Sequence, residues 1–285
     1  MPSSGAIPVY VINLDRSPER LAHMTAQLGR LGVNFERIRA VEGRELHNDY
    51  VAKFAPMAAS QIGCFLSHKL AWQKIAWGDA PYGIVLEDDI HIAPVFAEFA
   101  RSADWIPTDA DLVKLETMLT RVSTDTARLP GPASSRLARL RSLHPGTAAF
   151  VLSQKGARTL LEAFPDPVTA ADGVIFGEKT LRLITTFQAD PAPCIQDRVR
   201  PADEQDARLA ATINAGYFKP RIFEKVIREA RRLADQAITL TTAALQSSPP
   251  QQRLVVPFAG DTTISRFPDV SQLSSGDLRK RAREA

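Results

Sequence analysis

The chain has 285 residues, of which 45% are apolar and 24% charged, as in a globular protein with a sizeable core. No apolar run approaches the roughly 18 residues of a membrane span, and no basic segment precedes an apolar stretch at the N-terminus. The net charge is +3, and no basic stripe interleaves with aromatic residues, which argues against nucleic-acid binding. Two distant cysteines, Cys64 and Cys194, suit a reducing compartment, so we expect a cytoplasmic protein.

Apolar β-branched stretches alternate with helical patterns along most of the chain. In chain order these patterns predict strands over 9–14, 34–41, 82–86, 111–117, 146–153, 183–189 and 193–196, and helices from Pro18 onward and over 61–77, 96–101 and 154–164. Residues 42–60 and 120–142 are expected to be irregular, and residues 165–177 to form a turn with a short helix. The alternation favours an α/β fold with a mostly parallel central sheet flanked by helices.

The C-terminal part differs in composition from the rest of the chain. From Arg221 onward, eleven Lys and Arg residues stand against seven Asp and Glu residues, so the excess of positive charge lies there. We expect one folded domain over residues 1–215, an amphipathic helix over 216–245 and a flexible basic tail over 246–285. Such a tail favours peripheral contact with the anionic inner face of a membrane. The alternative is a helix packed on the domain and a solvated end.

Three adjacent acids, Glu87, Asp88 and Asp89, directly follow the strand predicted over 82–86. Alternate residues of a strand face the same way, so Glu87 and Asp89 should share one side while Asp88 points to the other. Ligands of open α/β sheets bind outside the carboxyl ends of strands. Two carboxylates at that place suit a hard divalent cation that also contacts phosphate oxygens. The alternative is a solvated acidic loop.

Other polar residues are expected near the same edge of the sheet. Asn and Arg side chains suit a nucleobase edge and phosphates, and Gly allows close backbone approach while Ser, Thr, His and Lys supply polar contacts. The candidates are Asn13, Arg16 and Arg20 after the first strand, Ser67 and His68 in the helix over 61–77, Lys114 and Glu116 on one face of the strand over 111–117, Gly146 and Thr147 at the start of the next strand, and Asp172 at a predicted helix start. Ordinary turn, packing and capping roles are the alternative for each.

Several of these stretches together resemble glycosyltransferase family 25, the lipooligosaccharide galactosyltransferase-like family that also includes procollagen galactosyltransferases. The resemblance rests on residues 11–20 (VINLDRSPER), 62–68 (IGCFLSH), 84–90 (IVLEDDI), 112–116 (LVKLE) and 146–153 (GTAAFVLS), which occur in the order that the family shows. It covers roughly residues 8–200. The resemblance implies a GT-A-like fold, in which residues 1–215 form the catalytic domain.

The resemblance also implies an inverting transfer of a hexose, most commonly galactose from UDP-galactose, to a saccharide acceptor such as lipopolysaccharide or lipooligosaccharide core. Glu87 and Asp89 would then hold Mn²⁺ or Mg²⁺, with Asp89 as the main ligand, while Asn13, Arg16, Arg20 and Asp88 would bind the donor nucleotide and diphosphate. Ser67, His68, Lys114, Gly146 and Thr147 would line the substrate site.

The base that inversion requires is the open point of this assignment. Family members usually show a Pro-hydrophobic-Asp segment, but here Thr169 follows Pro167-Val168 and the acid comes only at Asp172. Either the loop carries an insertion and Asp172 takes that part, or the acid is missing. Asp172 is therefore the first candidate for the base, and Glu116 the second, followed by Asp88.

Two other classes of function stay open. One is a metal-dependent phosphohydrolase acting on nucleotide-type substrates with the same acids, although a second His and Asp cluster for another metal is missing from the sequence. The other is a non-catalytic nucleotide-sugar-binding relative. Motifs of the common rival chemistries, such as Walker A, GxGxxG, GxSxG and HExxH, do not occur in the sequence.

Overall fold

The computed structural model describes residues 5–209 and 249–260. Within them, the main sheet has nine strands: β1 (Val9–Asn13), β2 (Glu36–Arg39), β3 (Tyr82–Glu87), β5 (Leu112–Lys114), β7 (Arg121–Pro130), β8 (Arg136–Leu140), β9 (Ala149–Ser153), β10 (Thr186–Asp190) and β12 (Gln251–Val255). Their order across the sheet is β12-β7-β8-β10-β5-β9-β3-β1-β2. A smaller sheet has the order β4-β11-β6, formed by β4 (Ile90–Ile92), β11 (Cys194–Gln196) and β6 (Glu116–Thr117).

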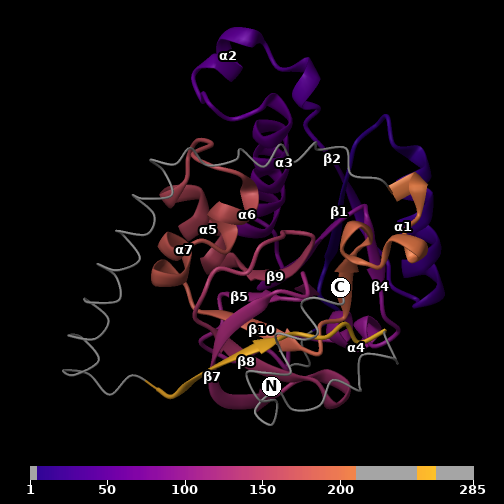
Figure 1. The fold of residues 1–285 in the computed structure, drawn as a ribbon, viewed down its shortest axis with the longest axis vertical. Helices are drawn as coiled ribbons and strands as arrows, with labels where there is room; N and C mark the ends of the chain where they lie inside the picture. Colours follow the sequence, from indigo (N-terminus) through magenta and orange to yellow (C-terminus); the bar gives the residue numbers. More distant parts are fainter. Residues whose placement is uncertain (1–4, 210–248, 261–285) are drawn as a thin grey trace, which may run out of the picture.

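Helices cover both faces of the main sheet (Figure 1). They are α1 (Pro18–Arg30), α2 (Asn48–Ala52), α3 (Ala59–Ala76), α4 (Phe96–Arg101), α5 (Gln154–Ala163), α6 (Ala171–Ile175) and α7 (Glu178–Leu183), with 3₁₀ turns η1 (Gly43–Glu45), η2 (Pro132–Ser134), η3 (Asp197–Val199), η4 (Ala202–Glu204) and η5 (Ala207–Leu209). This arrangement confirms the expected α/β class, in which a central sheet is flanked by helices.

Alternation along the strands divides the core into two layers. In β1, Tyr10 and Ile12 belong to the apolar cluster with α3, α5 and α6. Val9 and Val11 belong to the cluster with α1 and α4 on the other face. A strand buried on both faces reads as a continuous apolar run, which is why the sequence pattern located β1 and β3.

The sheet is mixed, which corrects the expectation of a mostly parallel one. β1 is parallel to β2 and β3, and β10 is parallel to β5, whereas β9 runs antiparallel to both of its neighbours, β3 and β5. The reason lies in the connection before β9. The chain leaves the carboxyl edge after β6, forms β7 and β8, and returns to that edge at Thr147, whose hydroxyl contacts Glu87. β9 can therefore only run back across the sheet.

Residues 120–142 were expected to be irregular, but they form the antiparallel pair β7 and β8. Most of β7 beyond Asp125 is exposed, so its sequence lacks the apolar alternation of a half-buried strand. The arginines of this hairpin are largely paired with acids. Arg141 makes two 2.7 Å contacts to Asp125, and Arg128 lies 2.6 Å from Asp190.

The expected flexible tail over 246–285 is corrected at residues 251–255. These residues form β12, which pairs antiparallel with β7 from Gln251 opposite Asp125 to Val255 opposite Arg121. The predicted helix over 216–245 and the basic end after residue 260 lie outside the described residues, and the predicted membrane contact of that end stays a prediction. Among the described residues, no helix is long and apolar enough to cross a membrane.

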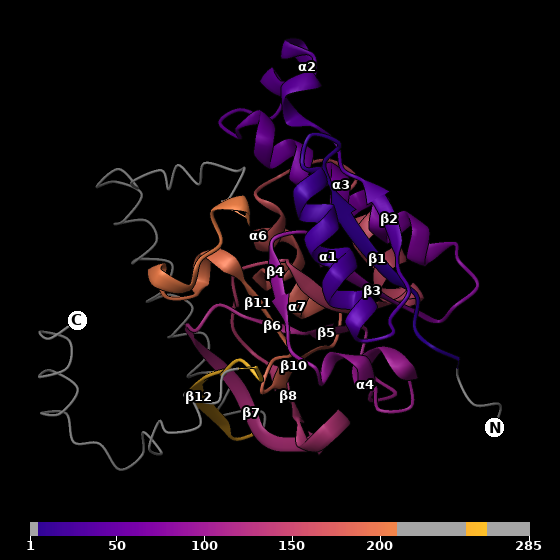
Figure 2. The ribbon, with the colours of Figure 1, turned by 90° about the vertical axis from the view of Figure 1, so that its right-hand side faces the viewer.

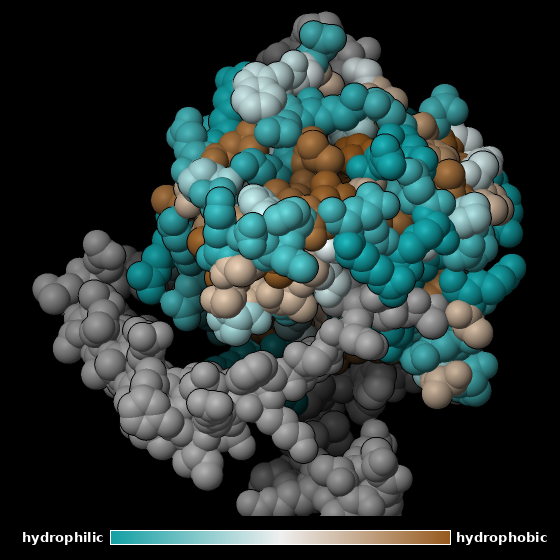
Figure 3. Space-filling view, turned by 90° about the horizontal axis from the view of Figure 1, so that it is seen from above, coloured by the Kyte–Doolittle hydropathy of each residue, from teal (hydrophilic) through white to brown (hydrophobic). Residues whose placement is uncertain are grey.

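Residues 43–58 project from the rest of the domain as a lobe that contains η1 and α2 (Figures 1 and 2). Tyr50 and Phe54 contact each other edge to face in this lobe, with ring centroids 5.1 Å apart. Within residues 43–58 only Gly43 is buried, so few buried contacts hold the lobe. Seen from this end, the surface of the molecule has apolar residues at its centre and hydrophilic residues around them (Figure 3).

Candidate active site

The carboxyl ends of β1 and β3 meet at one edge of the sheet. Because the two strands are parallel and Ile12 lies opposite Glu87, Asn13 ends β1 next to the acidic turn of Glu87, Asp88 and Asp89. The prediction that these groups share an edge is confirmed. The position of the acids also follows the general rule for ligand sites in open α/β sheets.

Glu87 and Asp89 lie on the same side of the turn, as the alternation predicted. The side-chain amide of Gln196 donates to Glu87 Oε2 over 3.2 Å and to Asp89 Oδ1 over 3.4 Å. Glu87 Oε1 also accepts from the Thr147 hydroxyl at 2.6 Å and is paired with His68 Nε2 at 2.9 Å. The structure thus brings His68, Thr147, Glu87 and Asp89 of the predicted set together.

Asp88 points to the other side and is enclosed by residues of β1 and α1. Asn13 Nδ2 donates to Asp88 Oδ2 at 2.6 Å, and Arg20 Nη1 donates to Asp88 Oδ1 at 2.8 Å. Arg20 also donates to the carbonyl of Leu209. Asn13, Arg20 and Asp88 are all buried, so in this structure they hold the acidic turn in place. Their assignment to the donor nucleotide stays a prediction.

The electrostatics of the two acids differ. Burial alone would raise the pKa of Glu87, but the hydrogen bond and charge of His68, with the Thr147 hydroxyl, bring that pKa below its ordinary value. Burial, followed by the charge of Glu87, raises the pKa of Asp89 to about 7. Two carboxylates that repel each other in a buried place suit a divalent cation, because oxygen ligands with net negative charge bind hard cations. This donor set fits Mn²⁺ or Mg²⁺.

A buried ion pair supports the loop that carries Thr147. Lys114 and Glu116 have no exposed surface, and Lys114 Nζ lies 2.8 Å from Glu116 Oε1. Lys114 also donates to the Gly146 carbonyl, while the backbone N–H of Ala148 donates to Glu116 Oε1 at 2.7 Å. The prediction that Lys114 and Glu116 share a face is confirmed. Because the Glu116 side chain has no exposed surface, a saccharide acceptor arriving from solvent could not contact it in this conformation.

Gly146 is needed at its position in this loop. Its φ is +87°, and a Cβ there would lie 2.9 Å from both carboxylate oxygens of Glu116. The left-handed conformation is open to glycine at little cost. Glycine at position 146 therefore allows the backbone to pass close to the buried Lys114–Glu116 pair just before Thr147, whose hydroxyl contacts Glu87.

The Ser67 hydroxyl forms hydrogen bonds with backbone groups. Its hydroxyl donates to the Gly63 carbonyl at 2.7 Å and accepts from the backbone N–H of Val41 at 2.9 Å. It thereby joins α3 to Val41, two residues after the end of β2, and its predicted role toward substrate stays a prediction.

Asp172 stands near the start of α6 and is partly exposed. Its Oδ1 accepts from the backbone N–H of Gly173 at 2.8 Å. The Asp172 charge reaches the acidic site, because it contributes, after burial and Glu87, to the raised pKa of the Cys64 thiol. It also acts on Lys114, whose pKa is lowered mainly by burial. Asp172 therefore lies close enough to Cys64 and Lys114 to act on the charge balance of both.

Arg16 lies beside a hollow at the ends of β1 and β2. It forms an ion pair with Glu42, and both line a cavity of about 460 Å³. The remaining lining residues are Leu14, Asp15, Arg39, Ala40, Val41, Glu45 and Leu46. Cavities of about 300–1,000 Å³ are the usual size for small-molecule sites.

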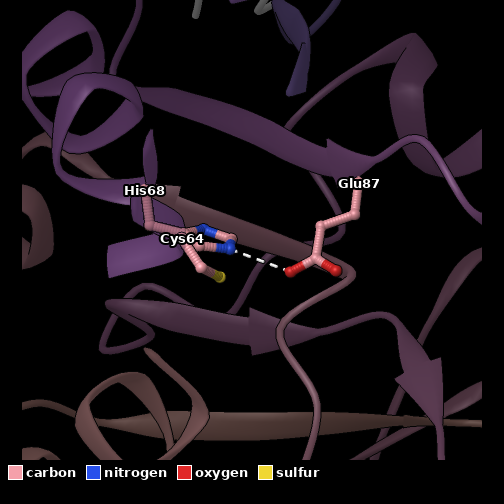
Figure 4. Close-up of side chains that lie close together, drawn as sticks. All are labelled: Cys64, His68 and Glu87. Carbon is pink, nitrogen blue, oxygen red and sulfur yellow. Dashed lines mark hydrogen bonds and ion pairs between the residues drawn. The ribbon is translucent and has the colours of Figure 1, made fainter. Parts of the chain in front are cut away.

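Sequence reasoning missed two residues of the site. Gln196 lies 109 positions from Glu87, and nothing in its local sequence signals this contact. Cys64 precedes His68 by one helical turn on α3, so its i, i+4 spacing could have placed both on one face. The close-up shows Cys64, His68 and Glu87 side by side (Figure 4).

Comparisons with known proteins identify the family. Residues 6–175 match the model of glycosyltransferase family 25 (LPS biosynthesis protein). The chain is 28% identical over 205 residues to the lacto-N-neotetraose biosynthesis glycosyltransferase LgtB of Neisseria gonorrhoeae, covering 66% of this chain and 74% of that protein. It is 23% identical over 203 residues to the lipooligosaccharide biosynthesis protein lic2B of Haemophilus influenzae, covering 66% and 75%.

Among solved structures, a glycosyltransferase involved in the glycosylation of the major capsid of PBCV-1 is similar with a TM-score of 0.42 and 9% identity, over 70% of this chain and 97% of that one. The family match, which spans more than half of the chain, is the decisive comparison. This protein belongs to glycosyltransferase family 25.

Proposed function

We propose that this glycosyltransferase moves galactose from UDP-galactose to a saccharide acceptor, with inversion at the anomeric carbon, during assembly of a lipooligosaccharide core. The observation that carries the proposal is the pair of carboxylates, Glu87 and Asp89, on one side of the carboxyl end of β3 and joined by Gln196. The names of the relatives in Neisseria and Haemophilus support the acceptor class. The choice of galactose rests on the family resemblance.

Glu87 and Asp89 would hold Mn²⁺ or Mg²⁺, with Asp89 as the main ligand. When bound, such an ion neutralises a diphosphate and stabilises the charge that develops on the departing nucleotide. The surrounding residues fix the two carboxylates for that purpose. His68, Thr147 and Gln196 hold Glu87, and Gln196 alone reaches across to Asp89.

The cavity at the ends of β1 and β2 is the proposed place for the nucleoside of the donor. Its lining begins at Leu14, the residue after Asn13 at the end of β1, and includes Arg16. A guanidinium suits phosphate oxygens. Arg16 would leave its ion pair with Glu42 and contact the donor diphosphate instead.

Asp172 is the proposed base. As the acceptor hydroxyl attacks the anomeric carbon, its proton passes to the Asp172 carboxylate, and the bond between that carbon and the UDP oxygen breaks. Asp172 is partly exposed near the acidic site, whereas Glu116 is fully buried and paired with Lys114. Exposure to an incoming acceptor therefore favours Asp172 over Glu116.

The test is a transfer assay with a panel of UDP-hexoses, a lipooligosaccharide-core acceptor and Mn²⁺, in which UDP release and the mass of the product are both measured. We expect product from UDP-galactose, no product after EDTA treatment, and loss of both transfer and Mn²⁺-dependent donor binding in Asp89→Asn. Full transfer in EDTA would refute the metal site. UDP-sugar turnover without any acceptor product would instead indicate the hydrolase alternative.

The base is tested separately with Asp172→Asn. We expect transfer to fall by about two orders of magnitude or more, the usual effect of losing a positioned base, with donor binding nearly unchanged. Asp166→Asn is the matched control, because Asp166 is an exposed acid a few residues away. An Asp172→Asn variant as active as Asp166→Asn would exclude Asp172 as the base.

A further inference from the structure

One group of side chains at the acidic site has a different chemistry from the carboxylate pair. Cys64 and His68 lie one turn apart on the same face of α3, and both point toward Glu87 at the end of β3 (Figure 4). A thiol sulfur, an imidazole nitrogen and a carboxylate oxygen of these residues lie within 4.8 Å of one another. Sulfur and nitrogen donors are not the ligands that Mn²⁺ or Mg²⁺ prefers.

The spacing of these three atoms is close to that of a tetrahedral metal site. With metal–ligand bonds of about 2.0–2.3 Å, the ligands of tetrahedral Zn²⁺ lie about 3.3–3.7 Å apart. His68 Nε2 and Glu87 Oε1 are 2.9 Å apart, so they would have to separate by a few tenths of an ångström. The Cys64 sulfur already lies within 4.8 Å of both.

Two of the three ligands are already held in place. The His68 ring stacks on Phe150 with centroids 5.9 Å apart, and Glu87 is held by Thr147 and Gln196. His68 is 1% exposed, and its Nδ1 atom has no hydrogen-bond partner among the described residues. The imidazole is therefore a buried ring that makes its hydrogen bond through Nε2, and Nε2, which faces Glu87, is the nitrogen that would bind the ion.

The surrounding charge favours a cation. Glu87, Asp89 and Asp172 all act electrostatically on the Cys64 thiol. Cys64 itself is partly exposed, so its thiol is not sealed off from ions in solution. A cation that binds here displaces the thiol proton to solvent and replaces the His68–Glu87 hydrogen bond by two metal–ligand bonds.

We propose that Cys64, His68 and Glu87 form a second cation site, selective for Zn²⁺ and similar borderline-soft ions, and that its occupation inhibits the enzyme. Three protein ligands leave a fourth position for water, as in open zinc sites. Inhibition follows because Glu87 is shared, so that one carboxylate cannot serve this site and the hard-cation site at the same time. The inhibition rests on the proposed function, whereas the binding does not.

Binding is tested with Co²⁺ as a spectroscopic probe of the purified full-length protein. Thiolate ligation gives a sulfur-to-cobalt charge-transfer band in the near ultraviolet, which carboxylate ligation does not give. We expect this band in the wild type, its loss on addition of Zn²⁺, and its absence in both Cys64→Ser and Cys64→Ala. Cys194→Ala is the matched control, because Cys194 is the other free cysteine and lies buried in β11.

Two outcomes of the cobalt titration would overturn the site: Co²⁺ binding without a charge-transfer band, or a band that persists in folded Cys64 variants and disappears in Cys194→Ala. Thermal unfolding of each variant identifies those that are folded. If neither Cys64 variant folds, protection of Cys64 from alkylation by stoichiometric Zn²⁺ in the wild type replaces this comparison, and equal alkylation with and without Zn²⁺ would overturn the site.

Inhibition is tested in the Mn²⁺-supported transfer assay. We expect the Zn²⁺ concentration for half inhibition, measured relative to the transfer rate of each protein without Zn²⁺, to rise at least tenfold in Cys64→Ser. Equal Zn²⁺ sensitivity of the wild type and the variant would overturn the inhibitory role. A protein that shows the cobalt band but no transfer under any condition would contradict the proposed function and leave the cation site in place.

Discussion

Lys114→Met is the most direct test of the buried pair that supports the site. Methionine keeps most of the aliphatic length of lysine but leaves the Glu116 carboxylate, which has no exposed surface, without its partner at 2.8 Å. Removing one member of a buried ion pair usually costs about 3–5 kcal/mol. The lost hydrogen bond to the Gly146 carbonyl adds about 1 kcal/mol. We therefore expect the free energy of unfolding to fall by about 4 kcal/mol or more.

Urea unfolding at pH 7 and 25 °C measures this loss, with Lys155→Met as the matched control. Lys155 also pairs with an acid, Asp111, at 3.2 Å, but the Lys155 side chain is 78% exposed. Asp111 is buried yet keeps hydrogen bonds from the Thr185 N–H and the Ser153 hydroxyl, so loss of the solvent-screened Lys155 charge should change stability little. The double variant Lys114→Met/Glu116→Gln removes the stranded charge and should be more stable than Lys114→Met alone. Equal losses in the two lysine variants would refute the importance of burial.

The pH dependence of the Lys114→Met deficit has a defined sign. Burial raises the pKa of Glu116 in the folded protein already in the presence of Lys114. A carboxyl group with a raised folded pKa stabilises the folded state at low pH and loses that contribution as pH rises through the folded value. The stranded Glu116 should therefore make the deficit smaller at pH 5 than at pH 8. A deficit that grows as the pH falls would contradict this account.

Two further predictions concern His144 and Gly146. Burial lowers the pKa of His144 to about 3, so below pH 6.5 the His144 imidazole takes up a proton in the unfolded chain but not in the folded one. Between pH 7 and 5, urea unfolding should therefore show that the wild type loses about 2 kcal/mol more stability than the non-titrating His144→Asn. Equal losses of stability in the two proteins would contradict this prediction. Gly146→Ala should lower the free energy of unfolding by about 1–3 kcal/mol and reduce transfer, because Gly146 has a positive φ and a Cβ there would contact Glu116. Gly29→Ala is the control, since a Cβ at Gly29 meets open space, and it should be neutral or stabilising. Similar unfolding curves for the two variants would refute the strain at position 146.

The elements that could be predicted from the sequence are those whose signal is local. β1 and β3 are short apolar runs buried on both faces, and α4 was predicted with its observed bounds. The opposite orientation of Asp88 relative to Glu87 and Asp89 followed from strand alternation alone. Each of these features depends on neighbours within a few residues.

Other features depend on contacts that no local pattern encodes. β7 and β12 lie at one edge of the sheet and are largely exposed, so backbone pairing between distant segments forms them rather than an apolar stripe. The direction of β9 is set by the path of the chain before it. In the site, Gln196 and Thr147 reach Glu87 from 109 and 60 positions away, and only the assembled fold shows these contacts.

In the acidic turn, Asp88 has a structural role, whereas Glu87 and Asp89 form the proposed cation site. Asp88 is bound by Asn13 and Arg20, which anchors the turn to β1 and α1. That anchor leaves Glu87 and Asp89 on the opposite side. Arg20, 3.9 Å from Asp89, offsets their mutual repulsion only in part, because burial and the charge of Glu87 still raise the pKa of Asp89. Repulsion between fixed carboxylates is a cost in the free protein and a source of affinity for a cation. The charge of Asp88 has a smaller effect on Asp89 than that of Glu87, and its carboxylate is bound by Asn13 and Arg20. Asp88→Asn should therefore act mainly on the stability of the turn, whereas Asp89→Asn should act on cation binding.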